Sequence, residues 1–188
     1  MNTFNKVLKS AFILTAIVLV LFFGLYIAYS TNVKIEPKDY YKYTMIICCF
    51  VLVPLFASFS FFTVLSVSRA KAKVAKTIDD LMTFKEGFKI GFYTMFIAGF
   101  ISLAVIFIFF NTSGEWAQDA LRNGILDTFK SNMDAEQAKV IEQSRKQPEI
   151  MNVNLFSFKY FFGLLSMFLS FYMGVSAMFA QFLKKRVY

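Results

Sequence analysis

Four long apolar stretches alternate with charged segments along this chain of 188 residues. They contain no Asp, Glu, Lys or Arg and cover residues 10–29, 43–67, 90–110 and 160–183. Each is 20 residues or longer, which is the length that a helix needs to cross the hydrocarbon core of a bilayer. A helix is required because lipid offers no partner to backbone N–H and C=O groups, and a barrel strand would alternate apolar and polar positions. The pattern predicts an all-α, polytopic membrane protein with four transmembrane helices in a single membrane domain, residues 1–188.

The segment between the third and fourth stretches, 111–159, is polar, and a connection of 49 residues without structure would be unusual. It predicts an amphipathic helical insertion, with Ser113 as the N-cap of a first helix and Asp134 at the start of a second. Apolar side chains recur every four residues along the first helix, at Leu121, Ile125, Phe129 and Met133. We interpret this stripe either as a surface that packs on the bundle or the lipid headgroups, or as a binding surface for a partner.

Small residues follow a helical spacing in the last two apolar helices. Gly87 and Gly91 form a G-x-x-x-G motif in the third, and Gly163, Ser170 and Gly174 lie on one face of the fourth. Helices without charged residues pack through such positions because their backbones can approach closely. We expect the fourth helix to pack inside a four-helix bundle through this face, so that Gly174→Leu would destabilise the bundle. A face for another membrane protein is the alternative.

The second stretch contains Pro54 and the adjacent Cys48 and Cys49. Pro54 predicts a kink, because proline cannot donate a backbone hydrogen bond and its ring clashes with the preceding turn. Neighbouring side chains of a helix point about 100° apart, so we interpret the two cysteines as small core residues rather than as a disulfide.

The charges predict the orientation in the membrane. Segments 1–9, 68–89 and 184–188 carry eleven Lys and Arg against three acids, whereas 30–42 and 111–159 carry nine of each. Because cytoplasmic loops are enriched in Lys and Arg, we expect both termini and the basic loop 68–89 in the cytoplasm, and 111–159 in the periplasm. The first stretch exceeds the apolar region of a signal peptide, so we expect it to remain as a helix. Basic flanks of membrane helices attract anionic lipid headgroups and do not indicate nucleic-acid binding.

The composition limits the chemistry that the chain can perform. Hydrophobic residues make up 57% of the chain, Phe alone contributes 26, and there is no His. Histidine catalysis and histidine metal sites are therefore excluded, and two cysteines alone do not complete a zinc site. The spans hold no Asp, Glu, Lys or Arg that would mark an ion pathway, and the acids of 111–159 alternate with basic residues. We expect no enzymatic activity, no catalytic residue, no cofactor and no metal.

Three features together resemble a known family. They are the pattern Phe84-x-x-Gly87-Phe88-x-x-Gly91 before the third span, the segment Asn132-Met133-Asp134-Ala135-Glu136-Gln137 ahead of a Glu-rich amphipathic helix, and the order of four spans. Over nearly the whole chain, the sequence resembles a family of small inner-membrane proteins of the Bacteroidota designated domain of unknown function 4199. The resemblance implies a bacterial inner membrane and supplies no catalytic residues. It also implies a polyprenyl-phosphate glycosyltransferase as one candidate partner.

Two functions remain as hypotheses. The first is a non-enzymatic inner-membrane subunit or accessory protein that associates with another membrane or envelope protein, or with a second copy of itself. The alternative is a small lipid or solute transporter with flippase-like properties, in which hydroxyl groups such as those of Ser60 and Ser102 line the polar path. Membrane lipids are partners in both cases, and nucleic acid is a partner in neither.

Overall fold

The computed structural model describes residues 3–31, 37–131, 143, 154 and 156–185, and the elements within them are all helices. In chain order they are α1 (Thr3–Ser30), α2 (Pro37–Ile46), the π-helical segment η1 (Ile47–Leu52), α3 (Val53–Val74), the short 3-10 helix η2 (Ile78–Asp80), α4 (Phe84–Thr112), α5 (Glu115–Ser131) and α8 (Phe158–Leu183).

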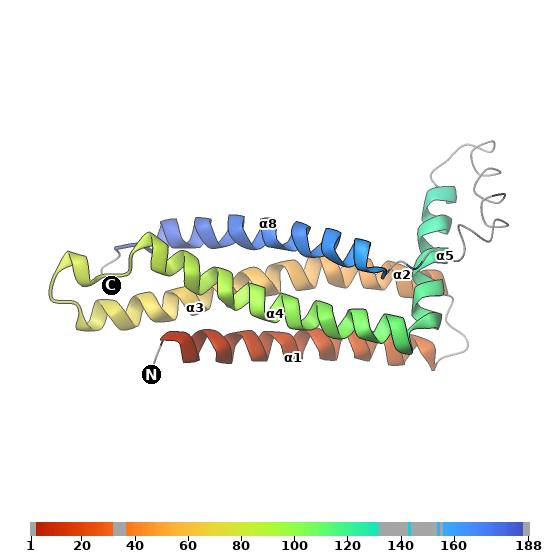
Figure 1. Ribbon diagram of the computed structural model, residues 1–188, viewed down its shortest axis with the longest axis horizontal. Coiled ribbons are helices and arrows are strands. Elements are labelled where there is room, and N and C mark those ends of the chain that lie inside the picture. Colours follow the sequence, from red (N-terminus) through yellow and green to blue (C-terminus); the bar gives the residue numbers. More distant parts are fainter. Residues whose placement is uncertain (1–2, 32–36, 132–142, 144–153, 155, 186–188) are drawn as a thin grey trace.

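The four predicted spans are confirmed as helices that are long and apolar enough to cross a membrane. They are α1, the run from Lys38 to Val74, the run from Ile78 to Thr112, and α8. Figure 1 shows them side by side in an elongated bundle, with α5 lying across one end. The chain begins and α8 finishes at the opposite end (Figure 1). We call these two ends the α5 end and the termini end.

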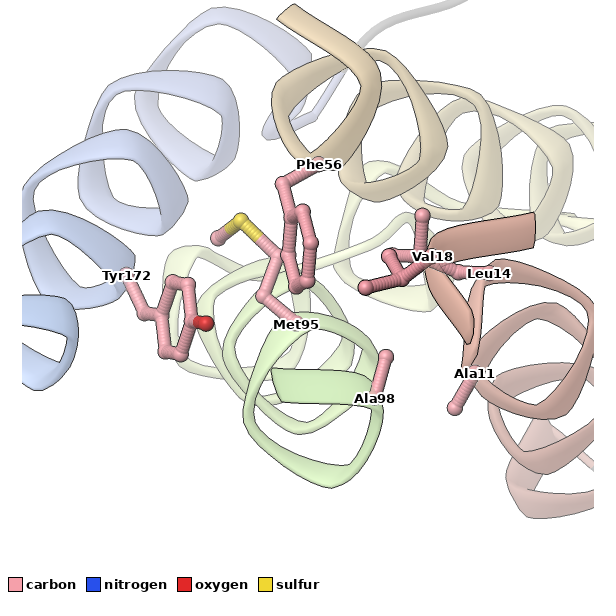
Figure 2. Packing of buried hydrophobic residues seen from close by; sticks show 7 residues of the cluster. All are labelled: Ala11, Leu14, Val18, Phe56, Met95, Ala98 and Tyr172. Carbon is pink, nitrogen blue, oxygen red and sulfur yellow. The ribbon is translucent and has the colours of Figure 1, made fainter. Parts of the chain in front are cut away.

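Helix α4 is the centre of the bundle, because its contacts with α1, α3 and α8 are the most extensive among the spans. Most of its small residues face inward: Gly87, Gly91, Ala98, Gly99 and Ser102 are buried. Ala98 belongs to a core cluster in which all four spans meet, with Met95 beside it on α4 (Figure 2). The predicted packing of the third span through its small residues is therefore confirmed.

Side chains from the other three spans complete that cluster around α4 (Figure 2). Helix α1 contributes Ala11, Leu14 and Val18, which recur at helical spacing and are at most 3% exposed. Phe56 of α3 stacks on Tyr172 of α8, with ring centroids 5.7 Å apart. The long side chain of Tyr172 fits because it lies over Gly99, where a Cβ would overlap its hydroxyl group.

The second span contains a π-helical segment, η1, just before Pro54, and the kink expected at Pro54 stays a prediction. The Val53 N–H donates to the Cys48 carbonyl, five residues back, instead of closing the usual four-residue turn. The missing N–H of proline makes such a local rearrangement less costly, because one helical hydrogen bond is lost in any case. The interpretation of Cys48 and Cys49 as core residues is wrong: both are exposed on the outside of the bundle, where lipid can cover apolar thiols.

Two hydrogen-bonded caps form the turn at the termini end. The Asp80 carboxylate accepts hydrogen bonds from the N–H and the hydroxyl of Thr77 at 2.9 Å. Thr83 is the N-cap of α4 and accepts from the Glu86 N–H, and Lys71 Nζ of α3 lies 2.6 Å from Glu86 Oε1. The Glu86 carboxylate also accepts a hydrogen bond from the Thr83 N–H, so Lys71 and Thr83 hold it at the start of the helix. Helix α4 therefore begins well before its charge-free stretch.

Candidate functional site

The first candidate surface is α5, which packs against α2 through its small residues. Ala117 and Ala120 are almost fully buried, and a Cβ at Gly124 would overlap the Cβ of Tyr41. These three positions recur at helical spacing on one face, so two helices can approach closely there. Next to them lies Tyr40, which is fully buried. Helix α5 is thus anchored mainly by small residues rather than by the apolar stripe that the sequence singles out.

The apolar stripe is divided between inside and outside. Leu121 packs against the cluster around Tyr40 and Phe110. In contrast, the side chain of Ile125 is only partly buried, and that of Phe129 is 54% exposed. Four residues turn an α-helix by 400°, so a repeat of four drifts around the helix by about 40° at each step. The stripe therefore leaves the buried face as it proceeds. Met133 and the predicted second helix from Asp134 lie outside the described residues.

Aromatic and hydrogen-bonding contacts hold α5 against α2 and α4. Trp116 packs on Tyr40, with centroids 5.2 Å apart, as expected for an aromatic belt at the membrane surface. Gln118 Nε2 donates to the Phe110 carbonyl at 2.8 Å and so satisfies one of the last carbonyls of α4. Gly114 precedes α5 and its carbonyl accepts the first helical hydrogen bond, from the Gln118 N–H. The prediction of Ser113 as an N-cap is wrong, because that residue is the C-cap of α4.

The second candidate surface is the outward face of α8, which we define by Gly163, Ser166, Ser170 and Gly174. A Cβ at Gly163 or Gly174 would find no other atom within 4 Å, and both serines are exposed. The opposite face of α8 packs into the bundle, through Tyr172, Ser176, Ala180 and Leu183. The expectation that Gly163, Ser170 and Gly174 pack inside the bundle is therefore wrong.

The physical reason for this correction lies in α4. Gly87 of α4 receives Ala180 of α8, whose Cα would lie 3.2 Å from an added Cβ. Gly91 receives Ser176, whose Oγ would lie 3.2 Å from an added Cβ. The close approach of α4 and α8 is therefore supplied mainly by glycines on α4. The glycines of α8 are not needed for it and remain on the outside.

The outward face of α8 also carries one larger polar residue, Gln181. Gln181 is exposed and lies seven residues after Gly174, which places it on the same side of α8. The Ser170 hydroxyl donates to the Ser166 carbonyl at 3.1 Å, so its oxygen lone pairs remain available as acceptors. The outward face therefore combines small residues with groups that can form hydrogen bonds. The sequence signal for Gln181 is its spacing of seven from Gly174, which is two helical turns.

The described residues hold no group of three or more Cys, Asp or Glu side chains that could bind a metal ion. No curated protein and no solved structure matches the chain. A family model described as a protein of unknown function, DUF4199, matches residues 9–185, which is nearly the whole chain. Because this match covers far more than half of the chain, the chain belongs to the DUF4199 family.

Proposed function

We propose that the protein is a non-enzymatic membrane subunit that binds another membrane protein through the outward face of α8. The observation that carries this proposal is the open space around Gly163 and Gly174, on the side of α8 that points away from the bundle. Within a membrane, apolar surface alone gives no driving force for helix association, since lipid tails are as apolar as leucine. Association depends instead on close packing and on hydrogen bonds between helices, and this face offers both.

The packing of α4 on α8 supplies a comparison within the same molecule. Gly87 and Gly91 of α4 already bring a neighbouring helix close enough to contact backbone and short side chains. The outward face of α8 has the same kind of residues at the same spacing, with no described helix covering it. A partner helix can therefore pack there as α8 itself packs on α4, with dispersion contacts over several turns.

We also propose that the protein lies in a bacterial inner membrane, with the termini end in the cytoplasm and α5 in the periplasm. The excess of Lys and Arg in segments 1–9, 68–89 and 184–188 supports this orientation. In a variant without Cys48 and Cys49, a cysteine at position 123 should react with a membrane-impermeant thiol reagent in cells whose outer membrane has been permeabilised. A cysteine at position 185 should react only after the inner membrane is opened. Reaction of position 185 before that step would reverse the orientation.

The test of partner binding is affinity purification in mild detergent, followed by mass spectrometry. We expect the wild-type chain to retain one stoichiometric membrane protein, and the double variant Gly163→Leu/Gly174→Leu to lose it. Two leucines on this face would hold the partner helix away. Overpacking of this kind costs about 1–3 kcal/mol per site, so the two sites together should lower the affinity by roughly thirtyfold or more. The melting temperature of the variant should stay at the wild-type value, because the added side chains meet open space.

Gly24→Leu is the matched control, because Gly24 of α1 also has no atom within 4 Å of an added Cβ but lies on another helix. This control should keep the partner. The proposal is wrong if the α8 double variant keeps the partner, if the control loses it equally, or if the wild-type chain retains no protein. Recovery of a second copy of the same chain alone would replace the proposed partner by self-association.

A further inference from the structure

A groove of about 380 Å³ lies between α1 and α3 near the termini end. Its lining comes from one face of each helix, namely Lys6, Lys9 and Ser10 of α1 and Phe59, Phe62, Thr63 and Ser66 of α3. The three residues of α1 recur at spacings of three and four, and so do those of α3, so each set lies on a single face. The two helices therefore form the two walls of the groove along their lengths.

The polarity of the groove changes along its length. The two lysines belong to the first turns of α1, and Ser66 lies opposite them, with Lys6 Nζ 3.5 Å from its Oγ. Phe59 lies seven residues before Ser66 in α3, which is about 10 Å deeper into the bundle. Phe62 lies between these two levels and is 63% exposed. The groove thus has a cationic, hydroxyl-lined mouth and an aromatic wall that continues into the membrane-spanning region.

The positive charge at the mouth is not neutralised within the described part of the chain. All three acids of segment 68–89 have partners elsewhere: Asp79 pairs with Lys185, Asp80 accepts from Thr77, and Glu86 pairs with Lys71. Among the described residues, neither Lys6 nor Lys9 has a carboxylate within ion-pair distance. The Lys6–Ser66 contact is at the long limit of a hydrogen bond, so the ammonium group retains donors for another acceptor.

We infer that this groove binds an anionic phospholipid, with its phosphate at Lys6 and Lys9 and an acyl chain along Phe59 and Phe62. Phosphate oxygens suit two ammonium groups and a serine hydroxyl, and basic pockets between membrane helices on the cytoplasmic side are known to bind anionic headgroups. The aromatic wall argues for a lipid rather than a free anion, because a soluble phosphate would leave it without a function. The site is separate from the proposed interface, since α1 and α8 lie on opposite sides of α4 and the face of α8 proposed as the interface points away from α3 and α4 (Figure 1).

The test is native mass spectrometry of the full chain in detergent, with phosphatidylglycerol, phosphatidylcholine of the same acyl chains, and inorganic phosphate as probes. We expect wild-type protein to prefer phosphatidylglycerol to phosphatidylcholine by about tenfold or more. The double variant Lys6→Gln/Lys9→Gln should lose about thirtyfold in affinity for phosphatidylglycerol, which is about fivefold per lysine. Lys6→Arg/Lys9→Arg should retain binding because it keeps both charges.

Lys73→Gln/Lys76→Gln is the matched control, since it removes the same charge from the same end of the molecule but outside the groove. It should leave the affinity nearly unchanged. Equal binding of the two phospholipids, retained binding by Lys6→Gln/Lys9→Gln, or an equal loss in the control would each overturn the inference. Inorganic phosphate binding as tightly as phosphatidylglycerol would also overturn it, because the groove would then recognise a free anion.

Discussion

A leucine in place of Gly91 is expected to lower the melting temperature of the bundle by about 10 °C, because overpacking costs up to about 3 kcal/mol. An added Cβ would lie 2.9 Å from Ser60 Oγ, 3.2 Å from Ser176 Oγ and 3.3 Å from Val64 Cγ2. Alanine would require only a small rotation of the Ser60 hydroxyl. The remaining side-chain atoms of leucine would find no free space, since Ser60 and Ser176 are fully buried between three helices. Thermal unfolding in detergent, followed by circular dichroism, measures the change.

Gly174→Leu is the control for this result, because it makes the same substitution on the outward face of α8. Its side chain would meet no other atom of the chain within 4 Å, so the melting temperature should remain at the wild-type value. If both variants melt at the wild-type temperature, Gly91 does not lie in a close contact. If Gly174→Leu melts lower, α8 presents the opposite face to the bundle and the description of its outward face fails.

The second large effect is expected from Gly124→Leu, which should detach α5 from α2. Its Cβ would overlap the Cβ of Tyr41, which is part of a helix and cannot rotate away. A clash of this kind costs about 3 kcal/mol or more, a shift of roughly a hundredfold in the docking equilibrium. Trp116, the single tryptophan of the chain, reports the event because it packs on Tyr40. Its fluorescence should shift to longer wavelength and become more accessible to acrylamide.

Phe129→Ala provides the matching control on the same helix. Phe129 is 54% exposed, so its removal should leave the emission and quenching of Trp116 unchanged. The opposite outcome, in which Phe129→Ala exposes Trp116 and Gly124→Leu does not, would restore the apolar stripe as the surface that anchors α5.

The spans and their ends could be predicted from the sequence because each rests on a local physical requirement. A stretch such as 90–110 has to be helical in lipid whatever its neighbours are. The turn before α4 rests on the same kind of local requirement, because Thr77 with Asp80 and Thr83 with Glu86 each supply a cap from residues three positions apart. These interactions do not depend on how the helices are arranged in the bundle.

The direction in which a span faces could not be predicted in the same way. In a soluble protein, apolar residues mark the inside, but in a membrane the outside is apolar too, so α8 carries no such signal. Gly163 and Gly174 suit either side, and the structure places them outside because Gly87 and Gly91 of α4 already provide the close contact. The anchoring face of α5 was missed for a related reason. A hydrophobic pattern gives little weight to Ala120 and Gly124 compared with Leu121 or Phe129. Yet the small size of Ala120 and Gly124 is what allows α2 to pack closely on α5.

The most direct measurement of the central claim is site-specific photo-cross-linking from the outward face of α8 in living cells. A photoreactive phenylalanine analogue at Met167, which flanks Gly163 on that face and is 59% exposed, is compared with one at Val20 of α1, which is 71% exposed. Both positions point away from the bundle, so each probe reports what lies beside the protein in the membrane. We predict a covalent product with one membrane protein from position 167 and none from position 20. The absence of a protein product from position 167, or the same products from both positions, would contradict the proposal that α8 is the interface.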